Sequence, residues 1–149
     1  MEPRLFPGIL GNAAASRTAI LLGLKLVNES LAGSFPSGES ALVRAVEFLR
    51  RHGRGVILAG AVSDGATFMA VETASGARRR GARAYAAIEV LKESFTAGAR
   101  PKDEPGCFCL AEALRKTRSS GQAVDYRGRG RWGGEIRLRL APVPSSRGA

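Results

Sequence analysis

One stretch of the sequence decides the fold: residues 28–61, NESLAGSFPSGESALVRAVEFLRRHGRGVILAGA. Its pattern predicts a strand, a tight turn, an amphipathic helix and a second strand in quick succession. The turn consists of Gly33, Ser34, Phe35 and Pro36. Acyl-transfer enzymes often carry a nucleophile on a turn of this kind, just before a helix N-terminus. Here the apex of the turn carries a phenyl ring instead.

The helix predicted after the turn has a signal at each end. Ser37 is placed to cap its N-terminus, and Glu39 puts negative charge near the positive end of the helix dipole. Basic residues at 50–52 precede Gly53, which is typical of a helix C-terminus. The interior has one apolar stripe with helical spacing, formed by Leu42, Ala45, Val46 and Leu49.

The strand predicted after this helix is a continuous apolar run at residues 56–61, VILAGA. Because polar residues do not alternate with apolar ones, the run predicts a strand covered on both faces in a parallel sheet. The expected fold class is therefore α/β, with helices packed on a sheet in layers.

Further elements are predicted on both sides of this stretch. A helix at 13–22, capped by Asn12 and ended by Gly23, leads to a strand at 26–31. A second amphipathic helix is predicted at 84–95, whereas residues 63–76 are compatible with either a short helix or a strand.

The last third of the chain is predicted to contain three short elements. Residues 107–113 form a strand or a passage from strand to helix, after a polar loop at 99–106. Two strands follow at 122–126 and 135–140, joined by a loop that contains GRGRWGG.

Four segments of the chain resemble the N-terminal half of β-ketoacyl synthases, the condensing enzymes of fatty acid and polyketide synthesis. They are GNAAASRTAILLGL at 11–24, VNESLAGSFPSG at 27–38, the helix through residue 51, and VILAGAV at 56–62. The resemblance implies a partial thiolase-like layered fold, with a mixed sheet and helices packed on it. It also implies a single domain at 1–142, best matched at 8–65. The composition of the C-terminal segment predicts a mobile tail at 143–149.

The resemblance places Phe35 where the family has its nucleophilic cysteine; a slip of one residue near Gly53 places Pro36 there instead. Neither residue is a nucleophile. The family's two catalytic histidines come from its C-terminal half, whereas this sequence has one histidine, His52. His52 lies about 15 residues beyond Ser37, which is roughly 20 Å along a helix, so it cannot activate that serine.

The resemblance therefore implies a protein without independent catalytic activity. Ser34, Phe35 and Ser37 are the residues expected at a vestigial acyl site. Ser37 is favoured as a helix cap over a nucleophile, because its surroundings are not Gly-x-Ser-x-Gly. No cofactor is expected.

The two cysteines do not predict a metal site or a disulfide. Cys107 and Cys109 are one residue apart, which suits neither a structural disulfide nor, with a single histidine in the sequence, a complete set of zinc ligands. Buried, reduced thiols on a strand are the favoured interpretation.

Positive charge is the strongest global signal. The chain of 149 residues has 23 Lys and Arg against 13 Asp and Glu, a net charge of +10. Residues 1–60 contain 7 basic and 4 acidic residues, and residues 61–149 contain 16 and 9, so the excess lies mostly in the second part. The arginines cluster at 78–83, 115–118 and 127–131.

Three interpretations compete for this charge. A basic surface would attract acyl carrier proteins, which are acidic partners of the resembled family. Nucleic-acid binding is less favoured, because no recognisable binding motif accompanies the charge. The third interpretation is that an arginine-rich composition alone accounts for it.

The favoured function is a partner subunit of fatty acid or polyketide synthesis that resembles the family's chain length factors. It would pair with an active synthase or an acyl carrier protein, as a homodimer or heterodimer. The alternatives are a truncated product without function and a small basic nucleic-acid-binding protein. No apolar run approaches the roughly 20 residues of a membrane span, so no membrane partner and a cytoplasmic location are expected.

Overall fold

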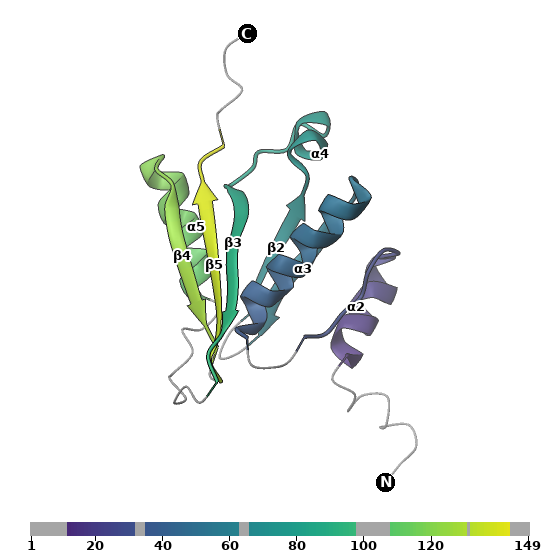
Figure 1. Ribbon diagram of the computed structural model, residues 1–149. Coiled ribbons are helices and arrows are strands. Elements are labelled where there is room, and N and C mark those ends of the chain that lie inside the picture. The colour runs from purple at the N-terminus through teal and green to yellow at the C-terminus, as the bar shows by residue number, and fades with distance from the viewer. Residues whose placement is uncertain (1–11, 32–34, 63–65, 98–107, 131, 144–149) are drawn as a thin grey trace. The chain divides into compact units, whose positions relative to one another are not determined.

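The structure, a computed structural model, describes residues 12–31, 35–62, 66–97, 108–130 and 132–143, and of Phe108 only the backbone (Figure 1). The chain divides into two compact units, Met1–Ala32 and Gly33–Ala149, each described by itself. Ser34 and most of the tail predicted at 143–149 lie outside the described residues.

The first unit contains helix α2, Ala13–Leu22, which confirms the helix predicted there. Gly23 ends it in the left-handed conformation, with φ of 62°. Asn12 is at the N-cap position, but its side chain makes no capping hydrogen bond. The strand predicted at 26–31 is wrong, because these residues have no regular structure and the described part of this unit offers no strand to pair with.

The second unit begins with helix α3, Ser37–His52, close to the predicted bounds. Gly53 ends this helix with φ of 68°. The predicted apolar stripe of the helix is buried. The predicted cap at Ser37 is wrong. Pro36 occupies the N-cap position, and no side chain caps the helix.

Strands β1, Val56–Val62, and β2, Ala66–Glu72, form a two-stranded antiparallel sheet in regular register. The predicted parallel sheet is therefore wrong. Helix α3 packs on one face of this hairpin, and of the β1 residues only Ala59 is buried. The apolar run was compatible with burial on both faces, but the described residues of this unit leave one face of the hairpin exposed.

The second sheet has three strands in the order β3-β5-β4, all antiparallel. Its strands are β3, Ala87–Phe95, β4, Val124–Arg129, and β5, Gly134–Ala141. The last two confirm the strands predicted at the C-terminal end, although the loop between them is shorter than expected. The short helix α4, Ala74–Arg79, lies between β2 and β3 in the sequence.

The helix predicted at 84–95 is wrong, because most of this segment is strand β3. Its apolar residues fit two periods. Ile88, Leu91 and Phe95 share a helical face, but Ile88 and Val90 also share a strand face. Pairing with β5 selects the strand period, and Ile88 and Val90 pack against the core. A bulge between Val90 and Lys92 then shifts the register, so that Leu91 is exposed.

Residues 107–113, predicted to begin as a strand, belong mainly to helix α5, Phe108–Ser120. Its buried residues Leu110, Leu114 and Thr117 recur at helical spacing. Thr117 donates a hydrogen bond from its hydroxyl to the Ala113 carbonyl, 3.0 Å away, which satisfies the buried polar group within the helix.

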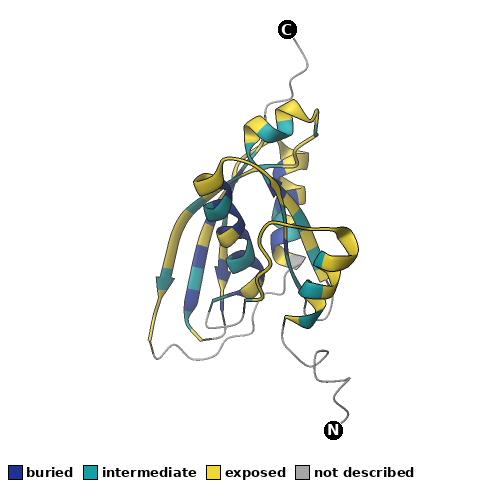
Figure 2. Cartoon of the chain, turned by 90° about the vertical axis from the view of Figure 1, so that its right-hand side faces the viewer, coloured by how far each residue is buried: buried dark blue, intermediate teal, exposed yellow. Residues whose placement is uncertain are grey.

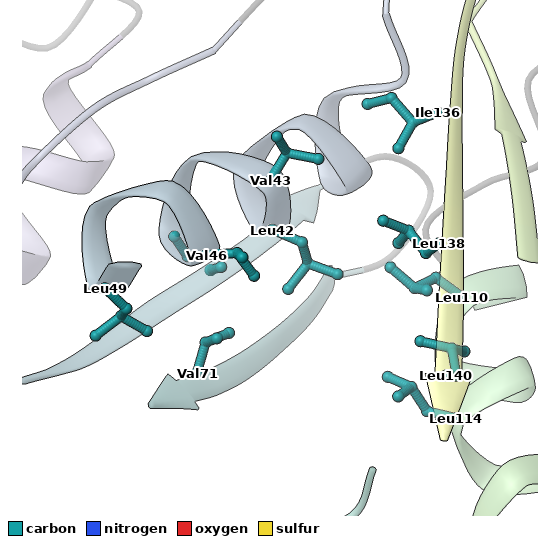
Figure 3. Close-up of a cluster of buried hydrophobic side chains, with 12 residues drawn as sticks. Leu42, Val43, Val46, Leu49, Val71, Leu110, Leu114, Ile136, Leu138 and Leu140 are labelled. Carbon is teal, nitrogen blue, oxygen red and sulfur yellow. The ribbon is translucent and has the colours of Figure 1, made fainter. Parts of the chain in front are cut away.

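One hydrophobic core joins the elements of the second unit. Figure 3 shows Leu42 of α3 extending toward Leu138 of β5 and Leu110 of α5, while Val46 and Leu49 lie over Val71 of the hairpin. Buried residues alternate with more exposed ones along β5. Figure 2 colours each described residue by its burial. The fold is thus mixed α/β, with helices packed on one face of each small antiparallel sheet.

No helix in the described ranges combines the length and the apolar character needed to span a bilayer.

Candidate functional site

The turn before α3 holds the residues that the sequence singled out for acyl chemistry. Phe35 is half-buried and packs against the core, and its ring centroid lies 6.4 Å from that of Phe95. Pro36 is buried, and its carbonyl accepts a hydrogen bond from the Ser40 N–H at 2.9 Å. Ser37 is exposed. The phenyl ring at this turn therefore anchors the start of α3 in the core.

The first turn of α3 contains a buried carboxylate. Glu39 is 2% exposed, and its Oε1 accepts a hydrogen bond of 2.6 Å from the Tyr126 hydroxyl. Burial raises the pKa of Tyr126 above its ordinary value, and the hydrogen bond to Glu39 adds to this rise. The neutral phenol thus stays a donor, and the pair ties the N-terminal turn of α3 to strand β4.

Gly128 allows this carboxylate to approach the sheet. A Cβ atom at position 128 would lie 2.7 Å from Glu39 Oε1 and 2.9 Å from Cγ and Cδ, closer than real Cβ contacts. A side chain at this position would displace the Glu39 carboxylate, so the glycine leaves room for it beside the sheet.

His52 lies at the opposite end of α3 from the turn. It is exposed, as the sequence predicted, and its ring packs against that of Phe48 at a tilt of 33°, with 4.2 Å between centroids. This position, in the last turn of the helix, keeps it away from Ser37 in the first. The structure therefore does not bring together the hydroxyl and the imidazole that a serine nucleophile would need.

The cysteine prediction is partly wrong. Cys109 is exposed on helix α5 and is not buried on a strand. Cys107 lies outside the described residues. Within the described ranges, no group of three or more His, Cys, Asp or Glu residues is arranged to hold a metal ion.

A cluster of ion pairs lies on the outer face of the three-stranded sheet, opposite the core. Glu135 of β5 contacts three arginines: Arg127 and Arg129 of β4, and Arg137 of β5. Arg137 Nε donates to Glu135 Oε1 at 2.8 Å. We call these four residues the Glu135 cluster.

Arginine contacts fix the charge state of this cluster. The hydrogen bond from Arg127 is the main cause that lowers the pKa of Glu135 to about 2, with Arg137 contributing further. Glu135 is therefore ionised at neutral pH. A carboxylate has about four lone-pair positions, whereas three guanidinium groups have about fifteen N–H donors, so most donors remain available for other partners.

A second ion pair lies on the same outer face, nearer the other end of strands β4 and β5. Arg139 donates from Nε and from a terminal nitrogen to the two carboxylate oxygens of Asp125, at 2.8 and 3.2 Å. The pair is exposed, and the hydrogen bond from Arg139 lowers the pKa of Asp125. A shallow depression of about 240 Å³ lies beside these groups; its lining residues are Leu91, Asp125, Tyr126, Arg127 and Arg137.

Sequence reasoning singled out Arg127 and Arg129 of this face, but it missed Arg137 and Arg139 and the carboxylates that order the arginines. The alternation of polar and apolar residues in β5 indicates that Glu135, Arg137 and Arg139 share a face. Their contacts with β4 depend on register, which the sequence does not specify. The Glu39–Tyr126 pair was missed because it joins residues 87 positions apart.

Comparison of the chain with protein-family models, with curated proteins and with solved structures finds no match.

Replacing Tyr126 by Phe is expected to lower the free energy of unfolding by about 1–3 kcal/mol, because the buried Glu39 carboxylate loses a donor. Tyr85→Phe is the matched control, since Tyr85 is exposed and keeps the ring that lies under Arg118. Urea denaturation followed by circular dichroism measures both. Equal stability of the Tyr126→Phe variant and the native chain would contradict the role given to this pair.

Acid is expected to weaken the sheet through Glu135. The pKa of this residue is about 2 in the folded chain and 4.5 as the reference value, so the unfolded chain binds its proton more readily. The stabilisation is complete above about pH 4.5 and is lost as the pH falls toward 2. Glu135→Gln should remove this part of the pH dependence of the melting temperature, whereas Glu112→Gln on α5 should keep it. Parallel pH profiles for the two variants would refute the assignment.

Proposed function

We propose that this protein is a β-ketoacyl-synthase-like partner subunit of fatty acid or polyketide synthesis without catalytic activity of its own. Within this proposal, a partial thiolase-like fold supplies the scaffold. An active synthase, or the acyl carrier protein that serves it, is the partner. The sequence segments at 11–24, 27–38 and 56–62 motivate the proposal.

The single observation that carries the proposal is the position of Phe35. The resemblance assigns this residue to the nucleophile, and its ring packs into the core at the start of α3. Acyl transfer requires a nucleophile with an assisting base. A phenyl ring at that point supplies packing in place of reactivity, which suits a subunit that shapes or supports the active site of another chain.

An open apolar surface supports the partner role. The hairpin face turned away from α3 exposes four large apolar residues, Val56, Leu58, Val62 and Phe68. Exposed apolar patches of this kind mark surfaces that another protein covers. On the proposed function, the active synthase is that protein.

The proposal predicts that the chain does not accept an acyl group. Incubation with acyl-loaded and malonyl-loaded carrier proteins should leave its mass at 15.7 kDa, since Phe35 cannot form a thioester. An active synthase treated in the same way is the positive control. Intact-mass spectrometry gives the result, and an acyl adduct on Ser37, Cys109 or any other residue would overturn the non-catalytic assignment.

The proposal also predicts that an active synthase, co-expressed with this chain, co-purifies with it by binding to the exposed face of the β1–β2 hairpin. Leu58→Glu places a charge at the centre of the open face and should reduce the co-purified synthase about tenfold, as expected for loss of a central apolar contact. Val143→Glu changes another exposed apolar residue, outside the hairpin, and serves as the control. No capture by the native chain, or equal capture by both variants, would contradict the proposal.

A further inference from the structure

The outer face of the three-stranded sheet carries a row of three cations that crosses all its strands. Lys92 of β3 pairs with Arg137 of β5, and Arg137 pairs with Arg127 of β4. Like charges directly opposite one another are unfavourable in a sheet. The row is tolerated because Glu135 contacts both Arg127 and Arg137.

This row remains open to a partner. The core-facing residues of β5 are Ile136, Leu138 and Leu140, and helix α5 packs on that side of the sheet. The side chains of Arg127 and Arg137 on the other side are 46% and 48% exposed. In the Glu135 cluster three cations face one anion, which leaves an excess of two positive charges.

From this surface we infer a docking site for the acidic face of an amphipathic protein helix. Neighbouring strands lie about 4.8 Å apart, and residues at i and i+4 on a helix have Cβ atoms about 5–6 Å apart. Carboxylates at i, i+4 and i+8 of a helix lying across the strands therefore match Lys92, Arg137 and Arg127. Arginine also binds carboxylates through paired N–H donors, which favours this geometry.

The depression beside the row adds an apolar contact. Leu91 lies at the β-bulge, is 42% exposed and lines the depression of about 240 Å³ together with Arg127 and Arg137. An aliphatic side chain on the docking helix, next to its carboxylates, would fill this space.

A nucleic acid fits this face less well than an acidic helix. Single-stranded nucleic acids bind to protein surfaces largely by stacking bases on aromatic rings. The strand pairing places eleven residues on the outer face, and none of them carries an aromatic ring: Ala87, Glu89, Lys92, Ser94, Asp125, Arg127, Arg129, Glu135, Arg137, Arg139 and Ala141.

The test uses a synthetic, fluorescently labelled helical peptide with Glu at i, i+4 and i+8 and Leu between them. Its binding to the full chain is measured by anisotropy at low and at physiological ionic strength. A peptide with Gln in place of Glu and an oligouridylate RNA are the comparison ligands. We expect the Glu peptide to bind and the Gln peptide to bind at least tenfold more weakly.

Matched variants separate this face from the overall charge. The double variant Arg127→Gln, Arg137→Gln should bind the Glu peptide roughly tenfold or more weakly than the native chain. Leu91→Ser should bind it about threefold more weakly. Arg78→Gln with Arg79→Gln removes the same charge from exposed positions on α4 and should change affinity less than twofold. Far-UV circular dichroism confirms that each variant is folded.

Three results would overturn the inference: no binding of the Glu peptide to the native chain, equal weakening by the two double variants, or tighter binding of the RNA through the same arginines. The assay contains no synthase and no carrier protein. Its failure would therefore leave the proposed function intact, and an acyl adduct or a failed synthase capture would leave this surface intact.

Discussion

The apolar stripe of helix α3 is the constraint on which the second unit depends. A two-stranded sheet is at best marginally stable by itself, and the neighbouring sheet has only three strands. Leu42 is fully buried where α3, α5 and β5 meet, while Leu49 and Val46 cover the hairpin (Figure 3). A helix covers the inner face of each sheet: α3 packs on the hairpin and α5 on the three-stranded sheet. Residues of α3 join both sheets into one hydrophobic core.

This dependence explains why the turn before α3 is occupied by structural groups. The N-terminal end of the helix is anchored by the Phe35 ring and by the hydrogen bond between Glu39 and Tyr126. Gly128 leaves room for the carboxylate. A reactive group in the turn would need space and access, whereas the described residues there are packed to hold α3 in place. The accessible polar chemistry of this unit lies instead on the outer face of the three-stranded sheet.

Local patterns in the sequence predicted the elements whose signals agree with one another. Helix α3 has an apolar stripe, an acidic first turn and a glycine at its end, so its bounds were predicted closely. Residues 84–95 had an ambiguous pattern, because their apolar residues fit both periods. The pairing of β3 with β5 decided in favour of the strand. The strand expected at 26–31 is absent because the described residues of its unit include no partner strand with which it could form hydrogen bonds.

The sequence by itself determined the ends and buried stripe of α3, the alternation along β5 and the excess of positive charge, because each depends on neighbouring residues and on composition. Only the tertiary structure decided that the two sheets are antiparallel, that Tyr126 meets Glu39, and that Glu135 holds three arginines together. These features join residues from different elements. Strand register and the shape of the core set their geometry, and neither is encoded in a local sequence pattern.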